Sequence, residues 1–259
     1  MRDALRCFVC SAAWLALSVL GAAASDIRVF SSGAPSEVGK VLGAAFARDT
    51  GHTVSFTVAT PGELQKKLTE GEKPDIVVLP SPVIDRLEKS GALMPGTRTD
   101  LARVGIGVVV RAGAPLPDVS SVDAVRKLLL GARSVVHTNP GGSGFAGAAV
   151  ARMIETMGIA DAIKPKLTLR QAIDGGVLLV AKGEAEVGLF NISEVLPVKG
   201  VTLVGPLPPE VQSYIVFTAA IHAGAPSPEP ARAFIKHLSD PSMRGQWQAG
   251  GLESLSGKI

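Results

Sequence analysis

Hydrophobic and polar positions repeat with two different spacings along the chain, and the two spacings alternate. Short apolar runs at 26–30 (DIRVF) and 74–80 (PDIVVLP) indicate buried strands, and the alternation at 52–59 (HTVSFTVA) indicates a third strand. The segments between and after them repeat apolar residues at helical spacing. The expected helices are 36–48, with Ser36 as its N-cap, 60–71 and 82–93. This β-α-β-α-β-α order over the first 95 residues is typical of a parallel sheet covered by helices.

Two longer apolar segments organise the rest of the chain. Residues 101–113 and 212–223 each indicate an extended strand, and further strand and helix patterns lie between them. The chain ends in two helical patterns separated at Asp240-Pro241. The simplest arrangement is an α/β fold with two lobes joined by two crossing segments. We predict residues 26–104 plus 219–259 for one lobe and 105–218 for the other.

The first 24 residues have the pattern of a signal peptide. Arg2 and Arg6 precede an apolar run that is too short for a comfortable membrane anchor, and small residues stand at 22–24. We predict cleavage after Ala24 and export to the periplasm. Both cysteines lie in this segment, at Cys7 and Cys10, so the mature chain would have neither a disulfide nor a thiolate metal site.

Charge and aromatic content exclude several classes of ligand. The chain has 26 Lys and Arg against 23 Asp and Glu, without the basic run that is typical of nucleic-acid binding. Aromatic residues make up only 4% of the chain, which disfavours a sugar site built on flat rings. We therefore expect no nucleic-acid partner. The exported protein is predicted to be a monomer.

Loops rich in Gly, Ser, Thr and Pro follow several expected strands. The segment 138–144 (TNPGGSG) stands directly before a regular helix, and 31–36, 59–63 and 190–193 also follow strands. Ligands of open α/β sheets bind at the carboxyl ends of strands, where helix N-termini offer free N–H groups to an anion. A turn or a helix cap is the alternative role for each loop. The candidate ligand-binding residues are Ser31, Ser32, Thr60, Gly142, Ser143 and Asn191.

Four phrases, in this order and spacing, resemble the periplasmic solute-binding proteins of ABC importers, most closely the molybdate-binding group. They are VFSSGA, LQKKLTEGEKPDIVVLPSPVIDRLEKSGAL, GVLLVAKGEAEVGLFNISEV and AFIKHLSDPSMRGQWQAGGLE. The resemblance implies a two-lobed periplasmic-binding-protein-like fold of type II, with two mostly parallel sheets and helices on both faces. It also implies a small anionic ligand such as molybdate or tungstate, an inner-membrane ABC permease as partner, and neither a cofactor nor a bound metal.

The residues expected to hold molybdate differ from the pattern of that group. The resemblance places a serine in each of the first two loops, and often a tyrosine after the strand VGLF. This chain has Ala34, Pro61 and Asn191 at those positions. A small organic carboxylate is therefore the alternative ligand, especially if a cationic side chain enters the site. The candidates for such a cation are Lys66, Arg111 and Arg170.

An enzyme is the alternative from another class, although we do not expect one. The four histidines show no metal-ligand spacing, and the Gly-rich loop matches neither a nucleophile elbow nor a phosphate-binding loop. His137 precedes Ser143 by six residues, so an exported hydrolase with a Ser–His pair stays open. A third alternative is an adhesion or signalling module that keeps the clamp without transport.

Overall fold

The computed structural model describes residues 24–141, 145–171 and 175–256, and its first half contains the expected βα units. β1 pairs in parallel with β2 on one side and with β3 on the other. A helix follows each of these strands, as the alternation of apolar patterns predicts. The elements are β1 (Asp26–Ser31), α1 (Gly33–Thr50), β2 (Thr53–Val58), α2 (Pro61–Thr69), β3 (Ile76–Pro80) and α3 (Ser81–Lys89).

Helix α1 begins four residues earlier than the sequence predicts. Ser32, not Ser36, is its N-cap residue, and the helix starts at Gly33 directly after β1. Ser36 lies inside the first turn, where its Oγ donates a hydrogen bond to the Gly33 carbonyl at 2.7 Å. A serine can act as an N-cap, and it can also lie in the first turn with its hydroxyl donating to a carbonyl three residues earlier. The residue type alone does not separate these two positions.

The second half repeats the βα arrangement. β5 pairs in parallel with β6 and with β7. The apolar pattern does not indicate β6, because its four side chains are exposed or only partly buried, whereas those of β5 are all buried. The elements are α4 (Val122–Gly131), β5 (Val135–Thr138), α5 (Phe145–Thr156), α6 (Ala160–Ile163), η1 (Lys164–Lys166), β6 (Leu167–Arg170), α7 (Gly176–Lys182), β7 (Val187–Asn191), α8 (Ile192–Val195) and β8 (Val201–Pro206).

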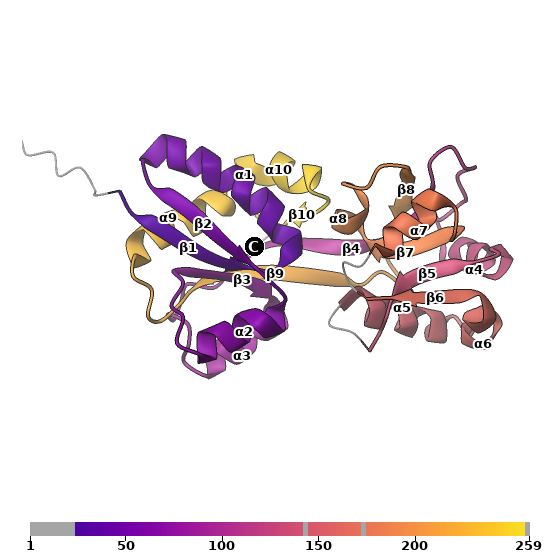
Figure 1. Cartoon of the computed structure of the whole chain (residues 1–259), viewed down its shortest axis with the longest axis horizontal. Coiled ribbons are helices and arrows are strands. Elements are labelled where there is room, and N and C mark those ends of the chain that lie inside the picture. Colours follow the sequence, from indigo (N-terminus) through magenta and orange to yellow (C-terminus); the bar gives the residue numbers. More distant parts are fainter. Residues whose placement is uncertain (1–23, 142–144, 172–174, 257–259) are drawn as a thin grey trace, which may run out of the picture.

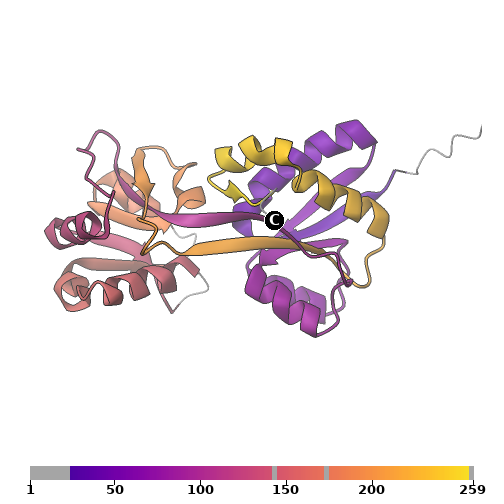
Figure 2. The same ribbon diagram turned by 180° about the vertical axis from the view of Figure 1, so that it is seen from behind.

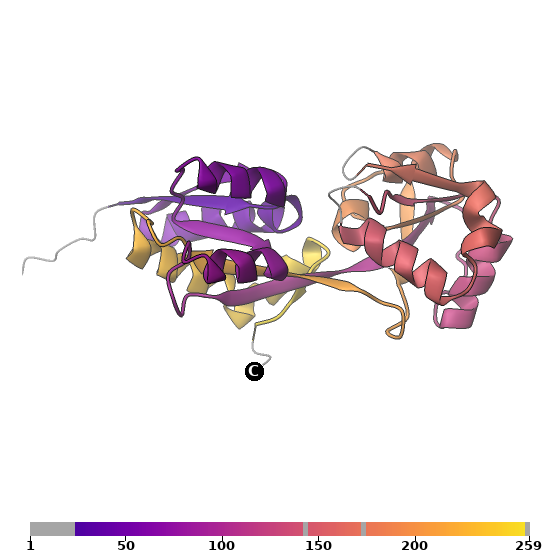
Figure 3. The same ribbon diagram turned by 90° about the horizontal axis from the view of Figure 1, so that it is seen from below.

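Two long strands join the halves, which Figures 1 and 2 show as separate bodies. β4 (Thr99–Arg111) pairs along its first part with β9 (Tyr214–Ile221), and along its second part with β7 and β8. These pairings are antiparallel, whereas the strands inside each βα unit are parallel. The view from below in Figure 3 shows β4 and β9 as the connection between the bodies. The chain ends in α9 (Pro228–Leu238), η2 (Pro241–Met243), α10 (Arg244–Ala249) and the short strand β10 (Glu253–Ser254).

Helices cover both faces of each sheet. The C-terminal helices α9 and α10 pack on the first half, and they are counted with it from here on. In the first half, α1, α9 and α10 bury Leu42, Phe234 and Trp247 on one face, and α2 and α3 bury Leu64 and Ile84 on the other. The second half repeats this arrangement, with α4, α5 and α6 on one face and α7 and α8 on the other. The predicted α/β fold class is confirmed. The predicted lobe ranges, 26–104 plus 219–259 and 105–218, stay a prediction.

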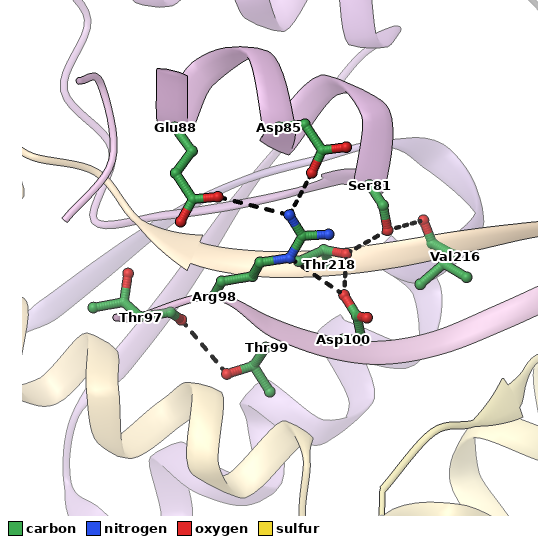
Figure 4. A network of polar contacts seen from close by, with 9 residues as sticks. All are labelled: Ser81, Asp85, Glu88, Thr97, Arg98, Thr99, Asp100, Val216 and Thr218. Carbon is green, nitrogen blue, oxygen red and sulfur yellow. Dashed lines mark hydrogen bonds and ion pairs between the residues drawn. The ribbon is translucent and has the colours of Figure 1, made fainter. Parts of the chain in front are cut away.

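A polar network holds α3 against the two connecting strands (Figure 4). Arg98 forms ion pairs with Asp85 and Glu88 of α3 and lies 3.9 Å from Asp100 of β4. Thr218 of β9 donates to Asp100 at 2.5 Å and shares a 2.7 Å hydrogen bond with Ser81, the first residue of α3. The network therefore fixes the end of β3 and the start of α3 relative to β9.

Candidate functional site

A cavity of about 510 Å³ lies where the first and second halves face one another. The starts of α1 and α2 and the end of β3 line it from the first half, and α5 and α8 line it from the second. Ile215 and Phe217 of β9 also line it. The volume falls in the range of about 300–1,000 Å³ that is typical of small-molecule sites.

The start of α1 offers backbone N–H groups to this cavity. Gly33 and Ala34, the first two helical residues, both line it, and the first turn holds no acidic residue. The N-cap residue Ser32 makes no side-chain hydrogen bond to the helix. An 18-residue helix with an uncapped N-terminus presents a positive dipole end, which favours an anionic group.

The hydroxyl groups of the first loop are already used inside the protein. The Ser32 Oγ donates to the Val78 carbonyl at 3.3 Å, and the Ser31 Oγ donates to the Ser32 carbonyl at 3.0 Å. Ser31 is only 1% exposed and does not line the cavity. A ligand in this arrangement would meet the Ser32 side chain and the start of α1, but not Ser31.

Thr60 lines the cavity and caps α2. Its Oγ1 accepts from the Glu63 N–H, while the Glu63 carboxylate accepts from both the Thr60 N–H and the Thr60 hydroxyl. These bonds lower the pKa of Glu63. The positive end of α2 therefore already has a carboxylate of its own chain beside it.

The second half contributes three polar side chains from one short segment. Asn191, Ser193 and Glu194 line the cavity at the junction of β7 and α8. The Asn191 Nδ2 donates to the Glu194 carboxylate at 2.7 Å. Among the described residues, the Asn191 Oδ1 and the Ser193 Oγ are covered by protein and have no hydrogen-bond partner. Buried polar atoms without partners are uncommon and often mark functional sites.

Glu194 is a largely buried carboxyl group beside the cavity. Burial raises the pKa of Glu194, and the hydrogen bond from Asn191 partly offsets that increase. Within the described residues, its carboxylate makes no ion pair, and Asn191 is its one hydrogen-bond partner. An ionised Glu194 therefore lacks a compensating charge.

The structure places three of the six predicted residues around one cavity. Ser32, Thr60 and Asn191 line it, Ser31 lies beneath it, and Gly142 and Ser143 fall outside the described residues. Sequence reasoning included Ser193 in the candidate loop 190–193 but did not select it as a ligand-binding residue, and it missed Glu194, the next residue. None of the three suggested cations is a described lining residue of the cavity: Lys66, Arg111 and Arg170.

The three positions that depart from the molybdate pattern all line the cavity. Ala34 begins the first turn of α1 after Gly33, Pro61 is the first residue of α2, and Asn191 ends β7. The first two thus present apolar groups at the places where the resemblance predicts hydroxyl groups.

His137 and possible metal ligands were the sequence features that bear on an enzyme. His137 is 1% exposed, its Nδ1 lies 2.6 Å from the Thr138 carbonyl, and it is not among the described lining residues. Its presumed partner Ser143 lies outside the described residues. No group of three or more His, Cys, Asp or Glu that could hold a metal ion occurs among the residues with described positions. Over the same residues, no helix is long and apolar enough to cross a bilayer.

Two curated proteins resemble the chain over most of their length. An aconitate isomerase from Pseudomonas sp. is 28% identical over 237 residues, which cover 89% of this chain and 88% of that protein. The molybdate-binding protein ModA from Rhodobacter capsulatus is 27% identical over 184 residues, 70% of each chain. One relative is named for an enzymatic activity and the other for the ion that it binds, so the two names do not agree on a ligand for this chain.

A solved structure and a family model assign the fold and the family. The substrate-binding domain of a putative molybdenum ABC transporter from Clostridium difficile superposes with a TM-score of 0.80 at 14% identity, covering 90% of this chain and 100% of that chain. The family model described as bacterial extracellular solute-binding protein matches residues 27–253. The resemblance to solute-binding proteins noted in the sequence is confirmed, and the chain belongs to the bacterial extracellular solute-binding protein family.

Proposed function

We propose that this protein is the periplasmic receptor of an ABC importer and that it binds a small organic carboxylate in the cavity between its halves. The family assignment and the predicted signal peptide support the transport role. The predicted lobes 26–104 plus 219–259 and 105–218 would be the two halves of the clamp. The permease is the expected protein partner.

The apolar side chains at the hydroxyl positions carry the choice of ligand. Ala34 and Pro61 line the cavity where a molybdate site would use serine hydroxyls. The Ser32 and Thr60 hydroxyl protons are donated to Val78 and Glu63. Molybdate is a compact dianion with oxygen on every side and no apolar part, so it needs donors all round, and the first half offers it few.

An organic carboxylate suits the same surface. Its charged end would accept from the backbone N–H groups of Gly33 and Ala34 at the positive end of α1. Its carbon body would contact Val38, Ile215 and Phe217, which line the cavity. Burial of apolar surface contributes about 25 cal/mol per Å². One relative is named for aconitate, a small organic acid.

Molybdate or tungstate, followed by sulfate, is the second candidate. It is supported by the relative named as a molybdate-binding protein and by the likeness to the structure from the molybdenum transporter. The relative named aconitate isomerase supports a third, catalytic candidate, the isomerisation of aconitate. NMR of aconitate incubated with the purified protein tests that candidate directly.

The test of the ligand is a thermal-shift panel followed by calorimetry. Succinate, malate, aspartate, aconitate, propionate, lactate and alanine are compared with molybdate, tungstate and sulfate. We expect at least one organic acid to raise the melting temperature, because a ligand at a hundred times its Kd stabilises the folded state by about 2.7 kcal/mol. A shift with molybdate or tungstate alone would reject the carboxylate and favour the second candidate.

A paired variant tests the position of the carboxylate. Ala34→Asp puts a carboxylate in the first turn of α1, so it should compete with the ligand and abolish the thermal shift. Val41→Asp adds the same charge at an exposed position farther along the same helix and should leave binding intact. If the two variants bound the ligand equally well, the start of α1 would not be part of the binding site.

A further inference from the structure

Acidic and basic side chains are distributed unequally around the cavity. Its described lining residues include two carboxyl groups, Glu37 and Glu194, and no Lys, Arg or His. Glu37 is 78% exposed and pairs with Lys40 at 2.7 Å, so its charge is balanced and solvated. The charge of Glu194 is neither balanced by a described cation nor well solvated.

The hydrogen bond from Asn191 holds Glu194 in one orientation. The Asn191 Nδ2 contacts one carboxylate oxygen, Oε1. The other oxygen, Oε2, has no hydrogen-bond partner among the described residues, and the side chain lines the cavity. A positioned carboxylate oxygen beside a cavity is a strong acceptor for an N–H or O–H group of a ligand.

The two neighbouring polar atoms, the Asn191 Oδ1 and the Ser193 Oγ, can also accept a hydrogen bond and have no partner among the described residues. Asn191 is 7% exposed, and its amide is oriented by Glu194, which leaves Oδ1 as an acceptor. The Ser193 Oγ is likewise unpartnered among the described residues. Protein atoms cover both oxygens in this arrangement, so they would reach a ligand only after a small movement of the segment. A segment with two unsatisfied acceptor oxygens, on Glu194 and Asn191, and a hydroxyl that can accept as well as donate gains from a ligand that carries donors.

We infer that Glu194, supported by Asn191 and Ser193, recognises a hydrogen-bond donor on the ligand, so that the bound acid is an amino acid or a hydroxy acid. This inference rests on the proposed carboxylate function. The carboxylate of the ligand lies at the start of α1 in the first half, and its ammonium or hydroxyl group lies at α8 in the second. Such a ligand bridges the halves, and its two ends match two different surfaces. An ammonium group would also balance the charge of Glu194.

The experiment compares acids that differ only in the donor. Calorimetry at constant pH and ionic strength gives the Kd of succinate, malate and aspartate, and of propionate, lactate and alanine. We expect the hydroxy or amino acid of at least one series to bind about tenfold or more tightly than the unsubstituted acid, because one unmade buried hydrogen bond costs about that factor. Equal affinity within both series would overturn the inference and leave the carboxylate function standing. Binding of molybdate alone would overturn both.

Substitutions test whether Glu194 causes the preference for a ligand with a donor. They also separate the contribution of its charge from that of its hydrogen bond. Glu194→Gln keeps the size of the side chain and an acceptor for Asn191 but removes the charge. It should weaken an amino acid at least about tenfold and a hydroxy acid less, while the unsubstituted acid is not weakened, because the variant only removes repulsion from its carboxylate. Glu229→Gln is the control, because Glu229 is an exposed, paired carboxyl group that is not among the described lining residues, and it should change neither preference. If the preference for the amino acid survived undiminished in Glu194→Gln, or disappeared in Glu229→Gln, the assignment to Glu194 would be wrong.

Discussion

The side-chain amide of Asn191 donates a 2.7 Å hydrogen bond to the carboxylate of Glu194, three residues further along the chain. The pair lies where β7 ends and α8 begins, beside the cavity. It holds a largely buried carboxylate that no described cation balances. A group of this kind opposes folding when it is ionised, so the segment beside the cavity lowers the stability of the ligand-free protein.

Glu194→Gln should stabilise the ligand-free protein at neutral pH. Burial raises the pKa of Glu194 above its ordinary value of 4.5, so the folded state favours the protonated form. Its contribution to stability is full below about pH 4.5 and is lost as the pH rises through the folded-state pKa. The melting temperature of the variant should exceed that of the wild type at pH 7, by about 2–4 °C for each kcal/mol. The difference should disappear toward pH 4, and a lower melting temperature at pH 7 would contradict the argument.

His137 should make the protein less stable in mild acid. Burial lowers the pKa of His137, and the contact with the Thr138 carbonyl only partly opposes this. The folded state therefore disfavours the proton, and stability should decline as the pH falls below about 6.5, the ordinary pKa. His222 contributes in the same direction through burial and the nearby Lys73. Chemical denaturation between pH 7.5 and 5 should show a weaker decline in His137→Gln and the weakest in the His137→Gln, His222→Gln double variant.

Two glycine-to-alanine changes in helices should have opposite signs. A Cβ on Gly147 of α5 would lie 2.5 Å from the Thr138 carbonyl oxygen and 2.6 Å from that of Asn139, which are backbone atoms. Gly147→Ala should therefore destabilise the protein by about 1–3 kcal/mol. Gly245 of α10 has no atom within 4 Å of that position, so Gly245→Ala should stabilise it by about 0.5–1 kcal/mol. Urea unfolding of both variants checks the signs, and a neutral Gly147→Ala would show that α5 can move away from β5.

Asp75 should be one of the most sensitive polar positions of the first half. It is fully buried, and its carboxylate accepts from the Arg28 N–H at 2.8 Å and from the Ser227 N–H at 2.6 Å. Asp75→Ala should cost about 2–4 kcal/mol because two backbone donors lose their partner. The control is Asp26→Ala, at an exposed position of the same sheet, which should cost less than about 1 kcal/mol. Similar losses in the two variants would contradict the structural role of Asp75.

The sequence by itself determined the class of fold and the main βα units. Apolar runs of four or five residues, as in β3 and β7, and helical repeats, as in α9, are local patterns, and local patterns predict local structure. The resemblance identified the family, and the strand-end rule pointed to Ser32, Thr60 and Asn191 as parts of one site. The sequence did not predict that α1 starts at Gly33. Ser36 is a residue type that often caps helices, and whether it does so here depends on where β1 ends.

Only the tertiary structure decided what each polar group does. Thr60 donates to Glu63 and Ser31 to the Ser32 carbonyl, so their hydroxyl protons are used inside the chain. Glu194 has no signal in the sequence that separates it from an exposed glutamate, since burial and charge balance depend on residues far away along the chain. The cavity joins Ala34, Asn191 and Phe217, which come close only when β4 and β9 bring the two halves together. Strand and helix periodicity carry no information about such long-range contacts, and the contacts decide which groups face a ligand.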